Sequence, residues 1–212
     1  MFRKFLVSIA FISMFNLTNA TIDFDKNLLQ DSKVYAATNQ ELAEQKLDEA
    51  KQFFNEGNNQ EAILKLTEAI KLNPNLEEAY LGRGVCYNDL KNYSAAISDF
   101  NKAIELNHNF EKAYLARGLL YFILDKYDKS ISDLYKVIEL NPNNSDAYFG
   151  LGNNYTFMKK YDNAILYYSK SIELNPNDAE SYYFRGLAYK AIGEIEKANS
   201  DFLKARELGF KE

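Results

Sequence analysis

The sequence of residues 77–110 reads EEAYLGRGVCYNDLKNYSAAISDFNKAIELNHNF, and the chain repeats this plan every 34 residues. Three positions show the period most clearly: a Tyr, a Gly and a second Tyr. They recur as Tyr80, Tyr114, Tyr148 and Tyr182, as Gly84, Gly118, Gly152 and Gly186, and as Tyr87, Tyr121, Tyr155 and Tyr189. A fixed period of this size is typical of stacked supersecondary units, each burying its apolar face against the next. The repeat therefore decides the architecture.

Each repeat is predicted to form two helices. Tyr80, Gly84 and Tyr87 have the spacing that places them on one face of a first helix, and the same spacing returns from Ala96 to Ala103 on a second. Small residues at the eighth and twentieth positions of the repeat let the two antiparallel helices approach closely, while aromatic rings fill the space toward the next pair. The predicted fold class is therefore all-α.

Turn residues mark the breaks between these helices. Asn92 is predicted to end a first helix and Ser94 to cap the second helix that follows. Most second helices end in Leu-Asn-Pro, where Pro stops the helix because it lacks an N–H and clashes with the preceding turn. These stops are Pro74, Pro142 and Pro176. His108 and Phe210 stand where the other repeats have Pro.

This pattern resembles the tetratricopeptide (TPR) repeat, which has aromatic, Leu, Gly, Tyr, Ala and Pro residues at fixed positions. The fourth repeat matches with Tyr148, Leu151, Gly152, Tyr155, Ala164, Tyr168 and Pro176. The resemblance implies a right-handed superhelical α-α solenoid. Its five repeats would lie at 43–76, 77–110, 111–144, 145–178 and 179–212.

Departures from the repeat pattern are predicted to mark the ends of the array. Lys46 and Ala50 replace the aromatic residue and the Gly in the first repeat. In the fifth repeat, Asn199 and Arg206 replace two Ile residues that recur in the other four. Positions seven apart share a helix face, so this face turns polar, as the end of a solenoid requires. Residues 179–212 are therefore predicted to be self-capping.

The segment 1–20 has the layout of a secretory signal peptide. Arg3 and Lys4 form a short positive region, an apolar run of 13 residues follows, and small residues precede a possible cleavage site at Ala20. A spanning helix needs about 20 apolar residues. The segment thus favours export to the periplasm or the exterior of a bacterium, and the alternative is an uncleaved N-terminal anchor.

Residues 21–42 are predicted to be a linker and the start of the first helix. Residues 21–39 show no sustained period and read as a linker or a marginal short helix. Thr38 and Glu41 have the spacing of a capping box, which predicts that the helical run starts there.

Composition excludes several functional classes. The net charge of −5 and the lack of a basic patch argue against nucleic-acid binding. A single cysteine, Cys86, excludes an intrachain disulfide or a multi-cysteine metal site, and it is predicted to be a buried small residue. The only histidine, His108, is predicted to be an exposed turn residue. We expect no catalytic residue, no cofactor and no metal.

Charged residues also recur in register. Arg83, Arg117 and Arg185 stand at the Leu position of the family pattern, on one side of the first helices. They are predicted either to form a ladder against acidic side chains such as Glu77 and Glu111, or to make structural or solvated ion pairs that contribute little. Three aspartates that share one position of the second helix are interpreted as a solvated face: Asp99, Asp133 and Asp201.

The resemblance implies that partners lie in a concave groove lined by the first helices. The groove positions are apolar in the middle of the chain, which suits an amphipathic helix or an extended peptide with hydrophobic side chains. The predicted groove residues are Leu81, Val85, Leu115, Leu119, Phe122, Ile123, Phe149, Asn153, Phe157, Tyr183 and Leu187. Those at the fifth and ninth positions of a repeat can instead pack between adjacent first helices.

The sequence therefore predicts a non-catalytic protein–protein interaction scaffold with a protein or peptide partner. The alternative is a structural subunit of an envelope complex or a homo-oligomer, assembling through its terminal faces or its convex, tyrosine-rich face. The tyrosines of that face are Tyr93, Tyr127, Tyr161 and Tyr167. An enzyme is the third and weakest class.

Overall fold

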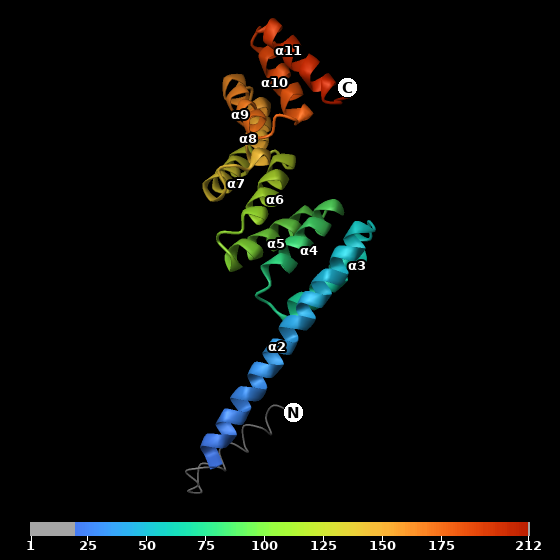
Figure 1. Cartoon of the computed structure of the whole chain (residues 1–212), viewed down its shortest axis with the longest axis vertical. Coiled ribbons are helices and arrows are strands. Elements are labelled where there is room, and N and C mark those ends of the chain that lie inside the picture. The colour runs from blue at the N-terminus through green and yellow to red at the C-terminus, as the bar shows by residue number, and fades with distance from the viewer. Residues whose placement is uncertain (1–19, 212) are drawn as a thin grey trace.

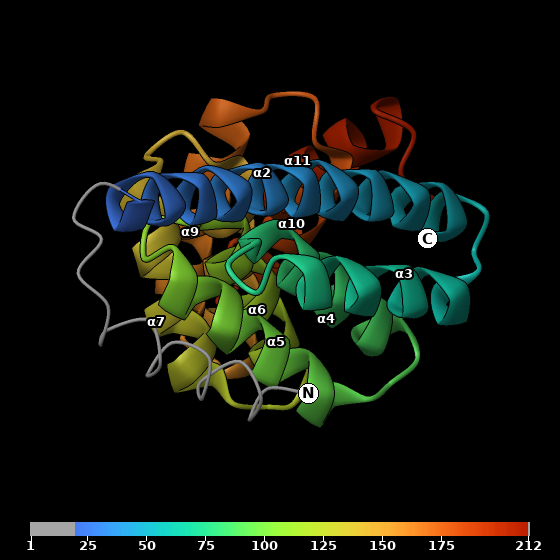
Figure 2. The ribbon, with the colours of Figure 1, turned by 90° about the horizontal axis from the view of Figure 1, so that it is seen from below.

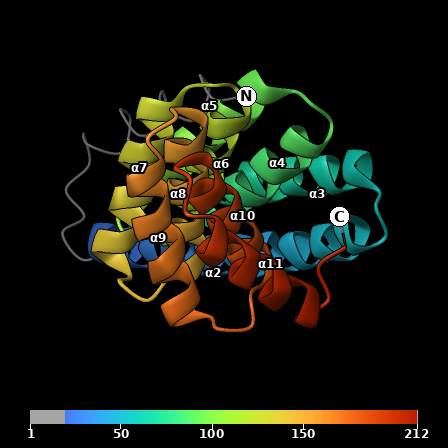
Figure 3. The ribbon, with the colours of Figure 1, turned by 90° about the horizontal axis from the view of Figure 1, so that it is seen from above.

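The computed structural model describes residues 20–211, and its regular secondary structure over that range is helical. The helices are α2 (Ala20–Asn55), α3 (Asn59–Leu72), α4 (Glu77–Asp89), α5 (Tyr93–Leu106), α6 (Glu111–Ile123), α7 (Tyr127–Leu140), α8 (Ser145–Phe157), α9 (Tyr161–Leu174), α10 (Ala179–Ala191) and α11 (Ile195–Glu207). Figure 1 shows them stacked as pairs along the longest axis, from α2 and α3 to α10 and α11. The end-on views in Figures 2 and 3 show α2 lying across one end and α10 with α11 across the other. The predicted all-α solenoid is confirmed.

Glycine at the eighth position allows the two helices of a pair to pack closely. A Cβ added to Gly152 would lie 2.5 Å from the ring of Tyr168, and one added to Gly84 would lie 2.6 Å from the ring of Phe100. Real Cβ atoms do not approach other atoms this closely, so each aromatic ring occupies the space that a side chain would need. This close approach was predicted from the sequence.

The turn within each pair has one residue in the left-handed region. These residues are Gly57 (φ 76°), Lys91 (φ 60°), Asp125 (φ 56°), Lys159 (φ 58°) and Gly193 (φ 85°). In the second repeat the next residue is the helix cap, because the side chain of Asn92 accepts a hydrogen bond from the Ala95 N–H. The predicted roles were wrong here: Asn92 starts α5 and Ser94 lies inside it. An Asn oxygen at the position before the helix reaches the free N–H groups of the first turn.

An asparagine forms each turn between repeats. The side-chain oxygens of Asn73, Asn107, Asn141 and Asn175 each accept a hydrogen bond from the backbone N–H two residues further on. The four residues have extended backbones with φ between −131° and −141°. Because the asparagine makes the turn, the second repeat tolerates His108 in place of Pro, and His108 is exposed as predicted.

Helix α2 is longer than the sequence predicts. It begins at Ala20 and runs without Gly or Pro through the region expected to be a linker. The hydroxyl of Thr38 donates to the Val34 carbonyl inside this helix, at 2.9 Å, so Thr38 is not a cap. Figure 1 shows the first half of α2 projecting beyond the other helices, and Val34 and Tyr35 are 57% and 70% exposed. The predicted signal peptide, apart from Ala20, lies outside the described residues.

The last helix pair ends on an aromatic contact. Gly209, with φ 94°, follows α11 and lets the Phe210 N–H reach the Ala205 carbonyl at 3.0 Å. The ring of Phe210 then stacks on Tyr183 with a centroid separation of 4.2 Å. Asn199 and Arg206 are exposed on α11. Over residues 20–211, no helix is both long and apolar enough to span a membrane.

Candidate functional site

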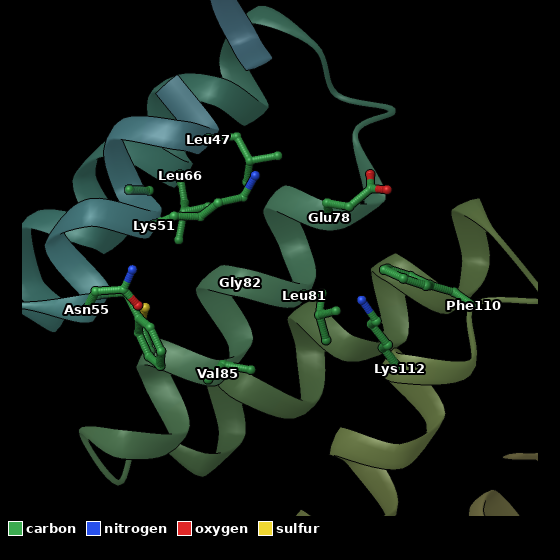
Figure 4. Close-up of a pocket in the computed structure, with 13 residues that line it drawn as sticks. Leu47, Lys51, Asn55, Leu66, Glu78, Leu81, Gly82, Val85, Phe110 and Lys112 are labelled. Carbon is green, nitrogen blue, oxygen red and sulfur yellow. The ribbon is translucent and has the colours of Figure 1, made fainter. Parts of the chain in front are cut away.

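A pocket of about 480 Å3 lies on the first-helix side of the N-terminal repeats (Figure 4). Its residues come from α2, α3, α4 and the beginning of α6. They are Leu47, Ala50, Lys51, Phe54, Asn55, Leu66, Glu78, Leu81, Gly82, Val85, Cys86, Phe110 and Lys112. The wall is mostly apolar, and two of the predicted groove residues, Leu81 and Val85, are part of it.

The pocket also carries charged groups of both signs. The Lys51 ammonium lies 2.7 Å from the Asp48 carboxylate. Glu78 and Lys112 are exposed and form no ion pair within residues 20–211. A ligand could therefore meet an unpaired cation and an unpaired anion beside the apolar wall.

A second apolar surface lies on α6 and α8, and we call Leu119, Phe122, Ile123 and Phe157 the apolar shelf. Ile123 and Phe157 are 55% and 62% exposed. The rings of Phe122 and Phe157 meet edge to face with centroids 5.1 Å apart, and Tyr127 packs about 6 Å from both. Large apolar side chains exposed together in this way are typical of interaction sites.

The other predicted groove residues mostly pack inside the array. Leu115 and Phe149, both at the fifth position of a repeat, contact buried clusters between neighbouring helices, and the pocket residue Leu81 does so as well. Tyr183, at the same position, is stacked under Phe210. Leu187, at the ninth position, is half-buried. The fifth position therefore serves packing within the array, whereas the ninth is half-buried at Leu187 and 41% exposed at Leu119.

The side chain of Asn153, a predicted groove residue, already forms a hydrogen bond within its own repeat. Its side-chain oxygen accepts a hydrogen bond from the Tyr168 hydroxyl at 2.7 Å. Burial raises the pKa of the Tyr168 hydroxyl, so this group stays a donor at neutral pH. The predicted groove residues thus divide into the pocket, the apolar shelf and a packed set.

The recurring arginines bind aspartates within their own repeats, in what we call Arg–Asp clamps. Arg83, for example, donates from Nε and Nη2 to the two oxygens of Asp99 at 2.8 and 2.9 Å. The other two clamps are Arg117–Asp133 and Arg185–Asp201. The three aspartates are only 5–6% exposed. The predicted solvated face was therefore wrong, because each carboxylate lies between two helices and is neutralised by a bidentate partner.

The glutamates expected to face the arginines have other partners. Glu77 accepts a hydrogen bond from the side chain of Asn107, and Glu111 accepts one from Asn141. These bonds tie the start of one repeat to the turn after it. The third donor of each clamp arginine reaches the preceding repeat instead, where it meets Thr67, Asn101 or Ser169.

The first and fourth repeats replace both members of the clamp together. In the first repeat the charges are reversed, with Glu49 and Lys65 joined at 3.1 Å. In the fourth repeat the pair is Leu151 and Tyr167, and Leu151 is fully buried. A sequence comparison of repeat positions 7 and 23 could have revealed this pairing, because the two positions change together in the two repeats that lack the clamp.

The pKa shifts of the described residues follow from burial and from ion pairing. Hydrogen bonds from Arg83 to Asp99 raise the pKa of the guanidinium. Cys86 is buried, as predicted, and burial raises the pKa of its thiol to about 11. Within the described part of the chain, no group of His, Cys, Asp and Glu side chains could hold a metal ion.

Sequence reasoning missed part of the pocket wall. Leu66 reaches it from the second helix of its repeat, and Phe110 from the turn before α6. The sequence did carry a signal for Phe110. The last position of the repeat is apolar in the first two repeats, as Leu76 and Phe110, and is Asn or Asp in the next two.

Comparison with known families gives consistent matches along the chain. A tetratricopeptide repeat family matches residues 77–110, 111–144 and 145–178, a TPR repeat family matches 50–90, and a further tetratricopeptide repeat family matches 167–198. A search of curated proteins gives no match.

Several solved structures are similar over most of the chain. A crystal structure of MamA is 31% identical, covers 75% of this chain and 93% of its own, and has a TM-score of 0.69. PilF of Pseudomonas aeruginosa is 19% identical, covers 82% and 80%, and has a TM-score of 0.77. YrrB, described as a TPR protein with an unusual peptide-binding site, is 22% identical, covers 77% and 84%, and has a TM-score of 0.64.

Proposed function

Because the chain belongs to the tetratricopeptide repeat family, we propose that it is a non-catalytic scaffold that binds a partner protein along its first helices. TPR proteins are in general interaction scaffolds, and the fold supports a protein or peptide partner here. The observation that carries the proposal is the pair of apolar surfaces on the first helices, the pocket and the apolar shelf.

The two surfaces suit different parts of a peptide or an amphipathic helix. The pocket can take a bulky apolar side chain, with Lys112 and Glu78 available to polar groups beside it. The apolar shelf offers Ile123 and Phe157 for a second apolar contact. Apolar anchors set in a polar rim are how helices and extended peptides are held in grooves. The TPR protein YrrB is described as having an unusual peptide-binding site, which supports a peptide ligand for a chain of this fold.

The test is a set of charged substitutions on the apolar shelf. Ile123→Glu with Phe157→Glu should retain wild-type circular dichroism, because both side chains are exposed, and should abolish co-purification of the partner identified by mass spectrometry. Leu166→Glu with Leu203→Glu is a matched control, since these residues are 61% and 58% exposed on second helices. Equal loss in both pairs, or in neither, contradicts groove binding.

The second candidate function is structural, as a subunit of an envelope complex or a homo-oligomer. The observation that favours it is the first half of α2, which extends past the repeats with Val34 and Tyr35 exposed. Sedimentation velocity over a wide concentration range separates the candidates. A strictly monomeric protein would remove the support for homo-oligomerisation.

We place this activity outside the cytoplasmic membrane, on the strength of the signal-like segment 1–20. N-terminal sequencing of the protein from cells tests this. A new N-terminus at Thr21 supports export with cleavage, whereas an intact Met1 in a membrane fraction supports the anchored alternative.

A further inference from the structure

In three repeats, an arginine side chain lies over the ring of a tyrosine of the same repeat. Arg83 lies over the ring of Tyr80 at 5.7 Å, and Arg117 lies over Tyr114 at 5.6 Å. Arg185 lies over Tyr182 at 5.5 Å. A guanidinium within about 6 Å of a tyrosine ring gains cation–π energy. The surface formed by the first helix and the preceding second helix is thus a place where this fold already accommodates guanidinium groups.

The fourth repeat has no arginine at this place, and its Tyr155 corresponds to Tyr121 and Tyr189, which lie under Arg117 and Arg185. Leu151 replaces the arginine and Tyr167 replaces the aspartate. The Tyr135 hydroxyl, from the preceding repeat, lies 2.6 Å from the Tyr167 hydroxyl and 3.2 Å from that of Tyr155. The rings of Tyr155 and Tyr167 stack at 5.3 Å. We call Tyr135, Tyr155 and Tyr167 the tyrosine trio.

The hydroxyl groups of the trio have more acceptors than donors to offer. A tyrosine hydroxyl carries one donor and can also accept hydrogen bonds. The two bonds within the trio use two of its three donors, so a single O–H remains while each oxygen can still accept. Burial raises the pKa of Tyr135, and the bond to Tyr135 raises the pKa of Tyr155, so these two hydroxyls stay neutral. A ligand with donors only is therefore complementary.

The trio is accessible through Tyr135, because Tyr155 and Tyr167 are half-buried against a buried cluster of α7 and α8, and it is separate from the apolar surfaces described above. Tyr135 is 43% exposed, and it is the central member of the hydroxyl network. Tyr155 stands two positions from both Asn153 and Phe157 on α8. Residues two apart on a helix do not share a face. The trio therefore points away from the apolar shelf.

We propose that the tyrosine trio is a docking site for an arginine side chain of a partner protein. Arginine fits because its planar guanidinium has five N–H donors, no acceptor, and a flat face that stacks on aromatic rings. The net charge of −5 favours a cationic ligand at long range. Lysine has fewer donors and no planar face, and we expect it to bind more weakly.

A peptide titration tests the chemistry directly. The probe is acetyl-Gly-Ser-Arg-Ser-Gly-amide, added to the full chain with 13C-labelled tyrosine rings and followed by NMR. We expect shifts confined to the trio. Replacing Arg by citrulline, which keeps the shape but not the charge, should weaken binding about tenfold or more. No binding, equal binding of the citrulline peptide, or shifts elsewhere overturns the proposal.

Two variants tie the binding to the trio. Tyr135→Phe with Tyr167→Phe keeps the rings and removes two hydroxyls, and should weaken the arginine peptide about tenfold. Tyr93→Phe with Tyr161→Phe is the control, because these half-buried tyrosines each begin a second helix outside the trio. Unchanged binding in the first pair, or equal loss in both, refutes the assignment.

A third variant guards against a fold defect. Leu151→Arg with Tyr167→Asp installs in the fourth repeat the clamp that three other repeats carry, so it should fold normally by circular dichroism and lose the peptide site. Peptide binding retained in that folded variant overturns the proposal.

A second copy of the chain is the competing source of the arginine, through the exposed Arg206. If the protein self-associates, and if both Arg206→Ala and the Tyr→Phe trio variant abolish this self-association, then the docked arginine comes from a second copy of the chain. That result would overturn the proposal that it comes from a different protein.

Discussion

At the scale of single residues, the Arg–Asp clamps illustrate how register governs packing. Two positions, 16 residues apart in the chain, form a clamp in the second, third and fifth repeats. The same two positions hold a reversed ion pair in the first repeat and Leu with Tyr in the fourth. A site between two helices accepts either a matched pair of charges or an uncharged pair, because a single buried charge is costly.

The clamp predicts a non-additive stability change. Asp133→Ala leaves the half-buried guanidinium of Arg117 without its carboxylate and should lower the free energy of unfolding by about 3 kcal/mol. The double change Arg117→Leu with Asp133→Tyr, which copies the fourth repeat, should cost less than Asp133→Ala alone. Urea denaturation followed by circular dichroism measures both. If the double variant is the less stable one, the pair is not an interchangeable unit.

The buried thiol of Cys86 is expected to react slowly with thiol reagents. Its pKa of about 11 means that little thiolate exists at pH 8, and its side chain is buried between helices. Reaction with a disulfide reagent at pH 8 should be at least about a hundredfold slower in the native protein than in guanidinium chloride. The rate should rise as the pH approaches the pKa, since only the thiolate reacts. Fast native labelling at pH 8 would show that the thiol is exposed.

Sequence reasoning at this scale was reliable for residues whose role is set within one repeat. The close approach at Gly152 and the burial of Cys86 were both predicted. The burial of Asp99 was not, because an aspartate on a helix is ordinarily exposed. Asp99 can be buried because Arg83 neutralises its carboxylate. The packing of the two helices of the repeat brings these two residues together.

At the scale of helices and turns, the left-handed residue of each pair is a source of strain. Lys91, Asp125 and Lys159 adopt φ near 58°, where Gly57 and Gly193 stand in the first and fifth repeats. A left-handed backbone costs a non-glycine residue about 1–2 kcal/mol, whereas glycine adopts it freely. Each of these three residues keeps this conformation because it lies between two packed helices, with the first helix of the repeat before it and the capping residue of the second helix after it.

The strain predicts a stabilising glycine. Lys159→Gly should raise the free energy of unfolding by about 0.5 kcal/mol, the relief of the left-handed backbone less the greater freedom of glycine in the unfolded chain. Lys190→Gly, inside the last turn of α10, is the control and should lower it by about 1 kcal/mol. Thermal melts of both variants decide. A loss in Lys159→Gly would mean that the lysine side chain contributes more than the backbone strain costs.

Helix ends were harder to predict than helices. Asn92 and Ser94 both suit a cap, and the structure chooses Asn92 because the left-handed Lys91 sets where the new helix can begin. The sequence predicts a linker or a marginal short helix for the first half of α2, because its apolar residues lack a period. Periodicity reports burial of one face, so a helix that projects beyond its neighbours leaves no such signal.

At the scale of the whole molecule, the outer face of α11 differs from the inner faces of the stack. In the second repeat, Ile97 packs with Phe100 and with Leu120 of the next repeat. The corresponding position on α11 is the exposed Asn199, and Arg206 is exposed seven residues further on. Polar residues at these positions keep a terminal helix from binding another apolar face.

This difference predicts that two substitutions will create a self-associating end. Asn199→Ile with Arg206→Ile restores the interior pattern beside Leu203, which is already 58% exposed. Each isoleucine buried in an association contributes about 2 kcal/mol, so sedimentation velocity should show a much steeper rise of the sedimentation coefficient with concentration than the wild type gives. Lys197→Ile with Lys204→Ile is the matched control, with the same spacing on another exposed part of α11. Association of both variants to the same extent would mean that added hydrophobicity alone drives it. Association confined to the first variant would mean that the repeat interface is specific enough to re-form between molecules, and that two polar side chains on α11 are what prevent it.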